Sequence, residues 1–273
     1  MMREQLIDSL RPVLGPPVRR MRREAQWFAL RGVLARERTA NARAHLVASH
    51  HTPLIRELPG VDPALQRNKV VNLRLAVAAL DGLLLQPGTV LSFWRLVGPP
   101  TSRRGYVDGL VLDHGRVSVG VGGGLCQLTN LLYWMTLHTP LRIRERWRHS
   151  YDVFPDSSRS QPFGSGATCA WPMLDLQIEN PTDDLYRLGL TVGDVELSGE
   201  WTSDVPMQAV YSVEERGHRI VSAGHGVHMR KNELWRIEQS LAGEFRCEQL
   251  IARNEALIMY EPFLPPAPEA EQT

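Results

Sequence analysis

The chain has 273 residues, of which 43% are hydrophobic and 22% are charged, and its formal net charge at pH 7 is +1. This length and composition predict a folded protein of one large or two small domains, and the near-neutral charge indicates neither a nucleic-acid-binding nor a membrane-surface protein. No apolar run approaches the length of about 20 residues that a bilayer requires. The N-terminus also lacks the apolar centre of a signal peptide. We therefore expect no integral membrane segment and a cytoplasmic location.

The three cysteines, Cys126, Cys169 and Cys247, lie far apart in the sequence. Their odd number and wide spacing argue against a disulfide framework and agree with a reducing compartment. Cys169 and Cys247 fall in predicted strands, whereas Cys126 opens a predicted helix. Cys126 is therefore the cysteine with a distinctive local setting.

Residues 1–64 form a predicted N-terminal helical segment. Residues 24–49 are rich in Ala, Arg, Glu and Leu, which favour helix. The pair His50 and His51 precedes a proline and is predicted to lie in an exposed turn. A basic cluster near the start is predicted to be a solvated arm or helix face, with contact to anionic lipid as the alternative. Its members are Arg19, Arg20, Arg22 and Arg23.

Residues 65–205 form the predicted core domain. Apolar residues recur at three- and four-residue spacing over 65–85, which predicts a helix that ends before the Pro-Gly turn at 87–88. Residues 106–112 and 116–121 are predicted to be the strands of a hairpin, and 141–147 alternates as a half-buried strand does. Further strands are predicted at 90–93, 167–171, 174–179, 186–192 and 195–201.

Residues 206–262 are predicted to be a β-rich C-terminal extension, and residues 263–273 a disordered tail. The strands of the extension are predicted at 207–213, 218–221, 232–239, 245–252 and 256–259. Together these patterns predict an α+β fold. It has N-terminal helices, a central mixed or antiparallel sheet packed on a cysteine-bearing helix, and a β-rich C-terminal part.

The stretch GVGGGLCQLTNLLYWMTLH carries the main functional signal. Gly122, Gly123 and Gly124 run into Cys126, and apolar residues at helical spacing follow it. Cys126 therefore lies in the first turn of a predicted helix, where backbone N–H groups and the helix dipole favour a thiolate. Glycines allow a substrate to approach the backbone closely, so the three are candidate substrate-binding residues. A buried structural thiol is the alternative.

His149 is the candidate general base for Cys126, because imidazole stabilises a thiolate near neutral pH. A helix over 126–138 would be roughly 18 Å long, and a strand over 141–148 roughly 25 Å. An antiparallel return would therefore bring His149 back to the level of Cys126. The alternative is that His149 ends a strand and faces solvent.

A third group often orients such an imidazole, and the sequence leaves several candidates open. They are Asp152, Asp156, Asp175 and Asn180. Gln127 is a candidate oxyanion-hole or substrate-binding amide, together with the N–H groups of the glycine loop. His225 and His228 have no carboxylate or thiol at ligand spacing, so we expect no metal site and no cofactor.

Several motifs in order resemble the VanW family, which takes its name from a vancomycin-resistance accessory protein. They are PGTVLSFWRLVG, RRGYVDG, GGGLCQLTNLLYW, RHSYDVFPD, FGSGAT and DLQIENPTD, and the resemblance covers residues 69–211. It implies a bacterial protein linked to the cell envelope, with an activity like that of an L,D-transpeptidase. It matches Cys126 to the family's cysteine and His149 to its histidine. Secreted members carry a membrane or signal segment and wall-binding domains, and this sequence is expected to resemble the shorter branch that lacks them.

The first hypothesis is therefore a cysteine acyltransferase that acts on a peptide or peptidoglycan precursor. Two alternatives stay open: a non-catalytic module that binds a peptide or cell-envelope partner, and a cysteine hydrolase that uses the same two residues. The substrate and the oligomeric state are not encoded in any pattern of the sequence that we recognise.

Overall fold

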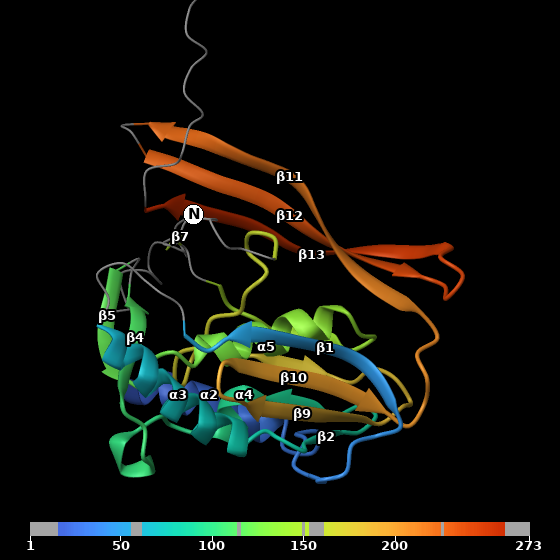
Figure 1. The fold of residues 1–273 in the computed structure, drawn as a ribbon, viewed down its shortest axis with the longest axis horizontal. Helices are drawn as coiled ribbons and strands as arrows, with labels where there is room; N and C mark the ends of the chain where they lie inside the picture. Colours follow the sequence, from blue (N-terminus) through green and yellow to red (C-terminus); the bar gives the residue numbers. More distant parts are fainter. Residues whose placement is uncertain are drawn as a thin grey trace, which may run out of the picture.

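The computed structural model describes residues 16–55, 62–113, 116–148, 151–152, 161–224 and 227–259. The predicted α+β fold is confirmed: helices pack on a four-stranded sheet, and long C-terminal strands extend beside this core (Figure 1). The predicted tail at 263–273 lies outside the described residues. The division into segments at residues 64 and 205 stays a prediction.

The central sheet is antiparallel, in the order β1-β10-β9-β2. Its strands are β1 (His45–Pro53), β2 (Leu84–Leu85), β9 (Tyr186–Val192) and β10 (Glu196–Ser203). The helix α5 (Cys126–Leu137) packs on β1 and β10, and α3 (Pro63–Ala78) packs on β9. Two smaller sheets adjoin the core: β3-β8-β6, and the hairpin of β4 and β5. Their strands are β3 (Val90–Ser92), β4 (Asp108–Asp113), β5 (Arg116–Val121), β6 (Arg142–Glu145) and β8 (Gln177–Glu179).

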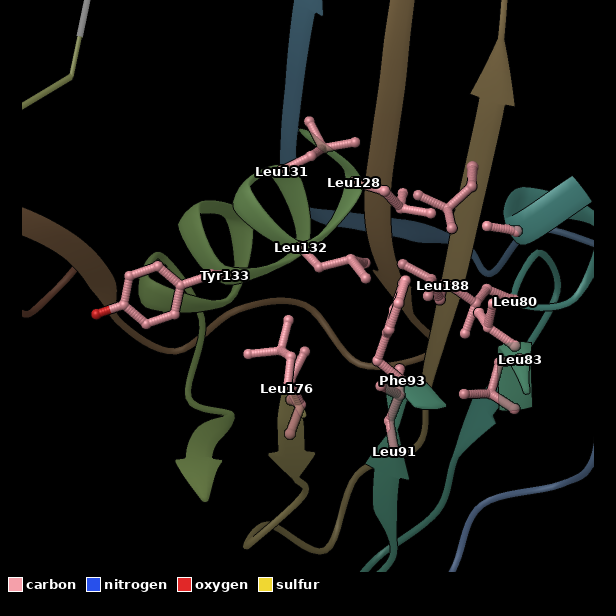
Figure 2. Close-up of a cluster of buried hydrophobic side chains, with 14 of the residues drawn as sticks. Leu80, Leu83, Leu91, Phe93, Leu128, Leu131, Leu132, Tyr133, Leu176 and Leu188 are labelled. Atoms are coloured by element: carbon pink, nitrogen blue, oxygen red, sulfur yellow. The ribbon is translucent and has the colours of Figure 1, made fainter. Parts of the chain in front are cut away.

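The leucines of α5 form the centre of the hydrophobic core. Leu128, Leu131 and Leu132 are each 0% exposed, as is Leu188 of β9. Figure 2 shows Leu128 and Leu132 facing Leu188, whereas the ring of Tyr133 leaves the helix on another side. Burying one such leucine contributes roughly 1.5–3 kcal/mol, so this face holds α5 firmly on the sheet.

The helix predicted over residues 24–49 is wrong for most of its length. The helix α2 (Pro16–Ala29) ends at Ala29, and His50 and His51 lie within β1 rather than in a turn. β1 pairs with β10 from His45 opposite Ser203 to Pro53 opposite Glu196. The hydrogen bonds of this distant strand outweigh the local helix propensity of the segment.

The solvated arm predicted for the basic cluster is wrong at Arg23. Its side chain is 2% exposed and forms an ion pair with Glu145 of β6, with Nη2–Oε1 at 2.6 Å. It also donates to the carbonyl oxygens of Pro172, at 3.0 Å, and of Met173. A charge is buried at acceptable cost only when it is paired and hydrogen-bonded, and these partners come from distant parts of the chain.

The first helix of the core domain is confirmed but ends earlier than predicted. Asp62 caps α3 by accepting a hydrogen bond from the backbone of Ala64 at 2.8 Å, and Pro63 occupies the first turn. The chain then turns at Gly82, whose φ is +76°, and continues into β2. Residues 84–85 therefore belong to the sheet, because they pair with β9 instead of extending the helix.

The C-terminal part forms a sheet in the order β11-β12-β13-β7. Its strands are β7 (Tyr151–Asp152), β11 (Val210–Gly224), β12 (Val227–Gln239) and β13 (Phe245–Ile258). The sequence predicts five short strands over residues 207–259, whereas the described residues of this region form the three long strands β11, β12 and β13. Bulges, such as that between Arg216 and Arg219, let a strand continue through residues that lack regular alternation.

Two short helices connect the strands of the smaller sheets. The helix α4 (Phe93–Val97) follows β3, and the 3-10 helix η1 (Ser102–Arg104) precedes the β4–β5 hairpin. The hairpin strands agree with the prediction at 106–112 and 116–121. Every helix in the described part of the chain is too short or too polar to span a bilayer.

Candidate active site

Cys126 is the first residue of α5, as the sequence predicts. The preceding loop turns through Gly122 and Gly124, whose φ angles are +79° and +91°, a region that favours glycine. The Cys126 side chain is half-buried. The sulfur therefore lies at the positive end of the helix dipole, where a negative charge is stabilised.

A second segment, residues 166–169, is fixed against the start of α5. Thr129 Oγ1 donates to the carbonyl oxygen of Ala167 at 2.6 Å, and the Ala167 N–H donates to Asn130 Oδ1 at 2.7 Å. Both backbone groups of Ala167 are thus held by the helix. This attachment positions the next two residues, Thr168 and Cys169, beside the Cys126 sulfur.

The Cys126 sulfur lies among polar groups of Thr168 and Cys169. Thr168 Oγ1 is 3.4 Å from it, and the backbone N–H of Cys169 donates to it at 3.5 Å. The sulfur of Cys169 is 3.9 Å away, and the Cys126 thiol, when protonated, donates to the carbonyl oxygen of Cys169 at 3.7 Å. A hydroxyl and a backbone N–H aimed at one sulfur stabilise its anionic form.

Cys169 has the opposite character. Burial raises the pKa of the Cys169 thiol well above its usual value, and the adjacent Cys126 sulfur raises it further through a hydrogen bond and its charge. Cys169 therefore stays protonated and is able to donate to Cys126. No motif in the sequence pairs these two cysteines, although FGSGAT immediately precedes Cys169.

The three loop glycines pack against protein atoms. A Cβ at Gly122 would overlap Pro100, one at Gly123 would overlap the backbone of Gly109, and one at Gly124 would overlap the Lys69 side chain. These close contacts explain why the loop needs glycine. The substrate-binding role of Gly122, Gly123 and Gly124 stays a prediction.

Gln127 links α5 to β1. Its Nε2 donates to Thr52 Oγ1 and to the carbonyl oxygen of Pro53, both at 2.8 Å. The two amide protons are thus used within the protein. An oxyanion-binding role for this amide, which stays a prediction, would require one of these bonds to open.

The candidate orienting residues that the structure describes have the following partners, and their orienting role stays a prediction. Asp152 is buried and pairs with Arg230 at 3.1 Å. Asp175 is buried, which raises the pKa of its carboxyl group, and it accepts hydrogen bonds from Ser92 Oγ at 2.6 Å and Trp94 N at 2.9 Å. Asn180 holds a turn by donating to carbonyl oxygens, including that of Leu85 at 2.9 Å.

His149 and Asp156 lie outside the described residues, as does His225. The approach of the chain to His149 is described as far as Arg148. The Thr168 N–H donates to the carbonyl oxygen of Trp147 at 2.8 Å. The residue that touches the Cys126 sulfur is therefore bonded to a residue two positions before His149.

Comparison with known proteins identifies related sequences. A family model described as "VanW like protein" matches residues 68–202. The chain is 35% identical over 212 residues to the vancomycin B-type resistance protein VanW of Enterococcus faecalis, which covers 77% of this chain and 75% of that protein. It is also 31% identical over 112 residues to the protein YoaR of Bacillus subtilis, covering 40% of this chain and 34% of YoaR. No solved structure matches the chain.

Proposed function

Because the chain belongs to the VanW family, we propose that it is a cysteine acyltransferase that acts on peptides of the peptidoglycan type. One observation carries the proposal: the Cys126 sulfur lies at the start of α5 and faces the Thr168 hydroxyl and the Cys169 N–H. The name of the Enterococcus faecalis relative connects that protein with vancomycin B-type resistance. This connection supports a substrate from the cell envelope.

In the proposed reaction, the Cys126 thiolate attacks the carbonyl carbon of a peptide bond, so that a C–S bond forms and the C–N bond breaks. His149 takes the thiol proton and gives it to the leaving amine. A second amine then attacks the thioester and gives a proton to His149, so that a new C–N bond forms, the C–S bond breaks and the Cys126 thiolate is released. The bond between Thr168 and Trp147 supports this role, because it holds the chain near Cys126 two residues before His149.

Two alternatives share parts of this site. If water replaces the second amine, the protein is a hydrolase that uses the same cysteine and histidine. If no acyl group is transferred, the protein is a non-catalytic module that binds a peptide or a cell-envelope partner, and Cys126 has a structural role. The three candidates differ in the covalent state of Cys126 and in the product, so one experiment separates them.

The test is intact-mass spectrometry of the full chain after incubation with synthetic cell-wall peptides, with and without an added amine. We expect an acyl adduct on Cys126 that the amine converts into a new peptide. Cys126→Ala should abolish the adduct, whereas Cys247→Ser, which changes an exposed cysteine, should leave it unchanged. Release by water alone would indicate the hydrolase, and binding without any adduct would refute catalysis.

A further inference from the structure

A cavity of about 390 Å³ lies between α5, β6 and the strands β12 and β13. Its most frequent lining residue is arginine, and none of the described residues that line it is acidic. The arginines are Arg142, Arg144, Arg146, Arg236 and Arg253. So many cations around one hollow indicate a site for an anion.

Three of these arginines share two neighbouring carboxylates. Glu179 lies 3.0 Å from Arg142 and 3.8 Å from Arg144, and Glu233 lies 2.9 Å from Arg253. These side chains are substantially exposed, with 57%, 44% and 73% of their surface accessible. Three guanidinium groups and two carboxylates leave a net charge of +1 here, and solvent screens these exposed side chains more strongly than buried ones.

Arg146 and Arg236 are held differently, by neutral groups. Arg146 donates to the carbonyl oxygen of Gly166 at 2.9 and 2.6 Å and to that of Gly164. Arg236 donates to the carbonyl oxygens of Thr139 and Leu141 at 3.1 and 3.0 Å, and to Gln249. Within the described ranges, neither has a carboxylate partner. Two positioned guanidinium groups thus keep their charge.

Tyr133 also lines this cavity and carries an unused hydrogen-bond donor. The residue is only 1% exposed, and its hydroxyl has no hydrogen-bond partner among the residues that the structure describes. The guanidinium of Arg146 lies 4.7 Å from the centre of its ring. Figure 2 shows the hydroxyl pointing away from the buried leucines. A buried hydroxyl without a partner is unfavourable, and a bound ligand would satisfy it.

We propose that this cavity binds the phosphate group of a small phosphorylated molecule, with Tyr133 donating a hydrogen bond and Arg146 and Arg236 offsetting its charge. Two uncompensated guanidinium groups match the double negative charge of a phosphate monoester better than the single charge of a carboxylate. The volume falls within the range of small-molecule sites and leaves room for an organic part. Tyr133 lies seven residues after Cys126, about 10 Å along the helix, so this site is separate from the sulfur.

The test is isothermal titration calorimetry of the full chain with inorganic phosphate, with phenyl phosphate and with acetate, at constant ionic strength. We expect saturable binding of both phosphates and weaker binding of acetate. Tyr133→Phe should weaken phosphate binding about tenfold, because it removes one charge-assisted hydrogen bond. Its thermal stability without phosphate should not fall, since the hydroxyl has no partner to lose. Arg146 is less suitable for this test, because it also ties down the loop at Gly164 and Gly166.

Two further variants serve as controls. Arg216→Gln removes an exposed arginine that pairs with Glu214 and Glu248 outside the cavity, and should leave binding unchanged. Cys126→Ser should also bind phosphate normally, so failure of the acyl-transfer proposal would not affect this one. The proposal is overturned if phosphate binding is not saturable, if acetate binds as tightly, or if Tyr133→Phe binds phosphate as well as the unmodified chain.

Discussion

At the level of single residues, the sulfur atoms of Cys126 and Cys169 are 3.9 Å apart but lie in different environments. Cys126 accepts a hydrogen bond from the Cys169 N–H, whereas burial raises the pKa of Cys169. The thiolate is the reactive form of cysteine, so reactivity should concentrate at Cys126.

We predict that limiting iodoacetamide modifies Cys126 before Cys169 at neutral pH. The experiment uses a Cys247→Ser background, because Cys247 is exposed and would compete for the reagent. Thr168→Val should slow alkylation of Cys126 roughly fivefold, since it removes one hydrogen bond of about 1 kcal/mol. Peptide mapping measures the rates, and Thr191→Val, which changes an exposed threonine of β9, is the matched control. Faster labelling of Cys169 would contradict the prediction.

A second residue-level prediction concerns His50. Burial lowers the pKa of His50 below its ordinary value of 6.5, and the nearby His51 and His138 lower it further by charge repulsion. Between the lowered pKa and 6.5, the unfolded chain binds more protons than the folded one, so stability falls as pH decreases through this window. Above pH 6.5 the contribution of His50 is fully present.

His50→Gln should therefore reduce the loss of thermal stability between pH 7 and pH 5. The exchange keeps a group able to hydrogen-bond Gln161, which lies 2.7 Å from His50 Nε2. Melting temperatures measured across this range test it, with His218→Gln as a control at an exposed position. If the pH dependence of stability is the same in His50→Gln, protonation of His50 does not contribute to the loss of stability at low pH.

At the level of elements, the loop before α5 depends on the close approach of two glycines. The carbonyl oxygen of Gly123 accepts a hydrogen bond from Asn72 of α3 at 2.9 Å, and its Cα faces the backbone of Gly109 in β4. Three elements, α3, β4 and α5, therefore meet at Gly123. The sequence predicts this glycine for substrate access, and the structure adds a packing reason.

We predict that Gly123→Ala destabilises the protein by about 3 kcal/mol, because one methyl group would force the loop and β4 apart. Gly32→Ala is the matched control, since nothing lies within 4 Å of a Cβ at that position. Urea unfolding of both variants measures the difference. Equal stability of Gly123→Ala and Gly32→Ala would mean that the loop moves without cost.

At the level of the whole molecule, the ion pair of Arg23 and Glu145 joins α2 to β6 across 122 residues of sequence. The Arg23 side chain is 2% exposed and that of Glu145 is 21% exposed. Removal of Glu145 leaves the buried Arg23 charge with only the more distant Asp175 carboxylate, whose Oδ2 lies 3.9 Å from Nη1. The pair thus fastens the N-terminal helix to the core.

Glu145→Gln should therefore lower the free energy of unfolding by about 3 kcal/mol. Arg253→Gln, which breaks the exposed pair with Glu233 on the C-terminal sheet, should change it by less than about 1 kcal/mol. Chemical denaturation of the two variants makes the comparison. If Glu145→Gln lowers the free energy of unfolding no more than Arg253→Gln does, the Arg23–Glu145 pair does not fasten α2 to the core.

The sequence by itself determined the elements whose signals are local. The apolar spacing after Cys126 predicts α5, the alternation at 186–192 predicts β9, and the short turn at 113–115 predicts the β4–β5 hairpin. The placement of Cys126 at a helix start follows from the same local pattern. These features need only neighbouring residues, because side-chain periodicity and turn chemistry act within a few positions.

Only the tertiary structure decided which distant segments meet. It placed His50 in a strand, buried Arg23 beside Glu145, and set Cys169 against Cys126 across 43 residues. Local propensity is weak compared with the pairing of a sheet edge, the desolvation of a charge or the docking of a loop on a helix. Those contributions depend on partners that no local pattern identifies, so they arise only when the whole chain has folded.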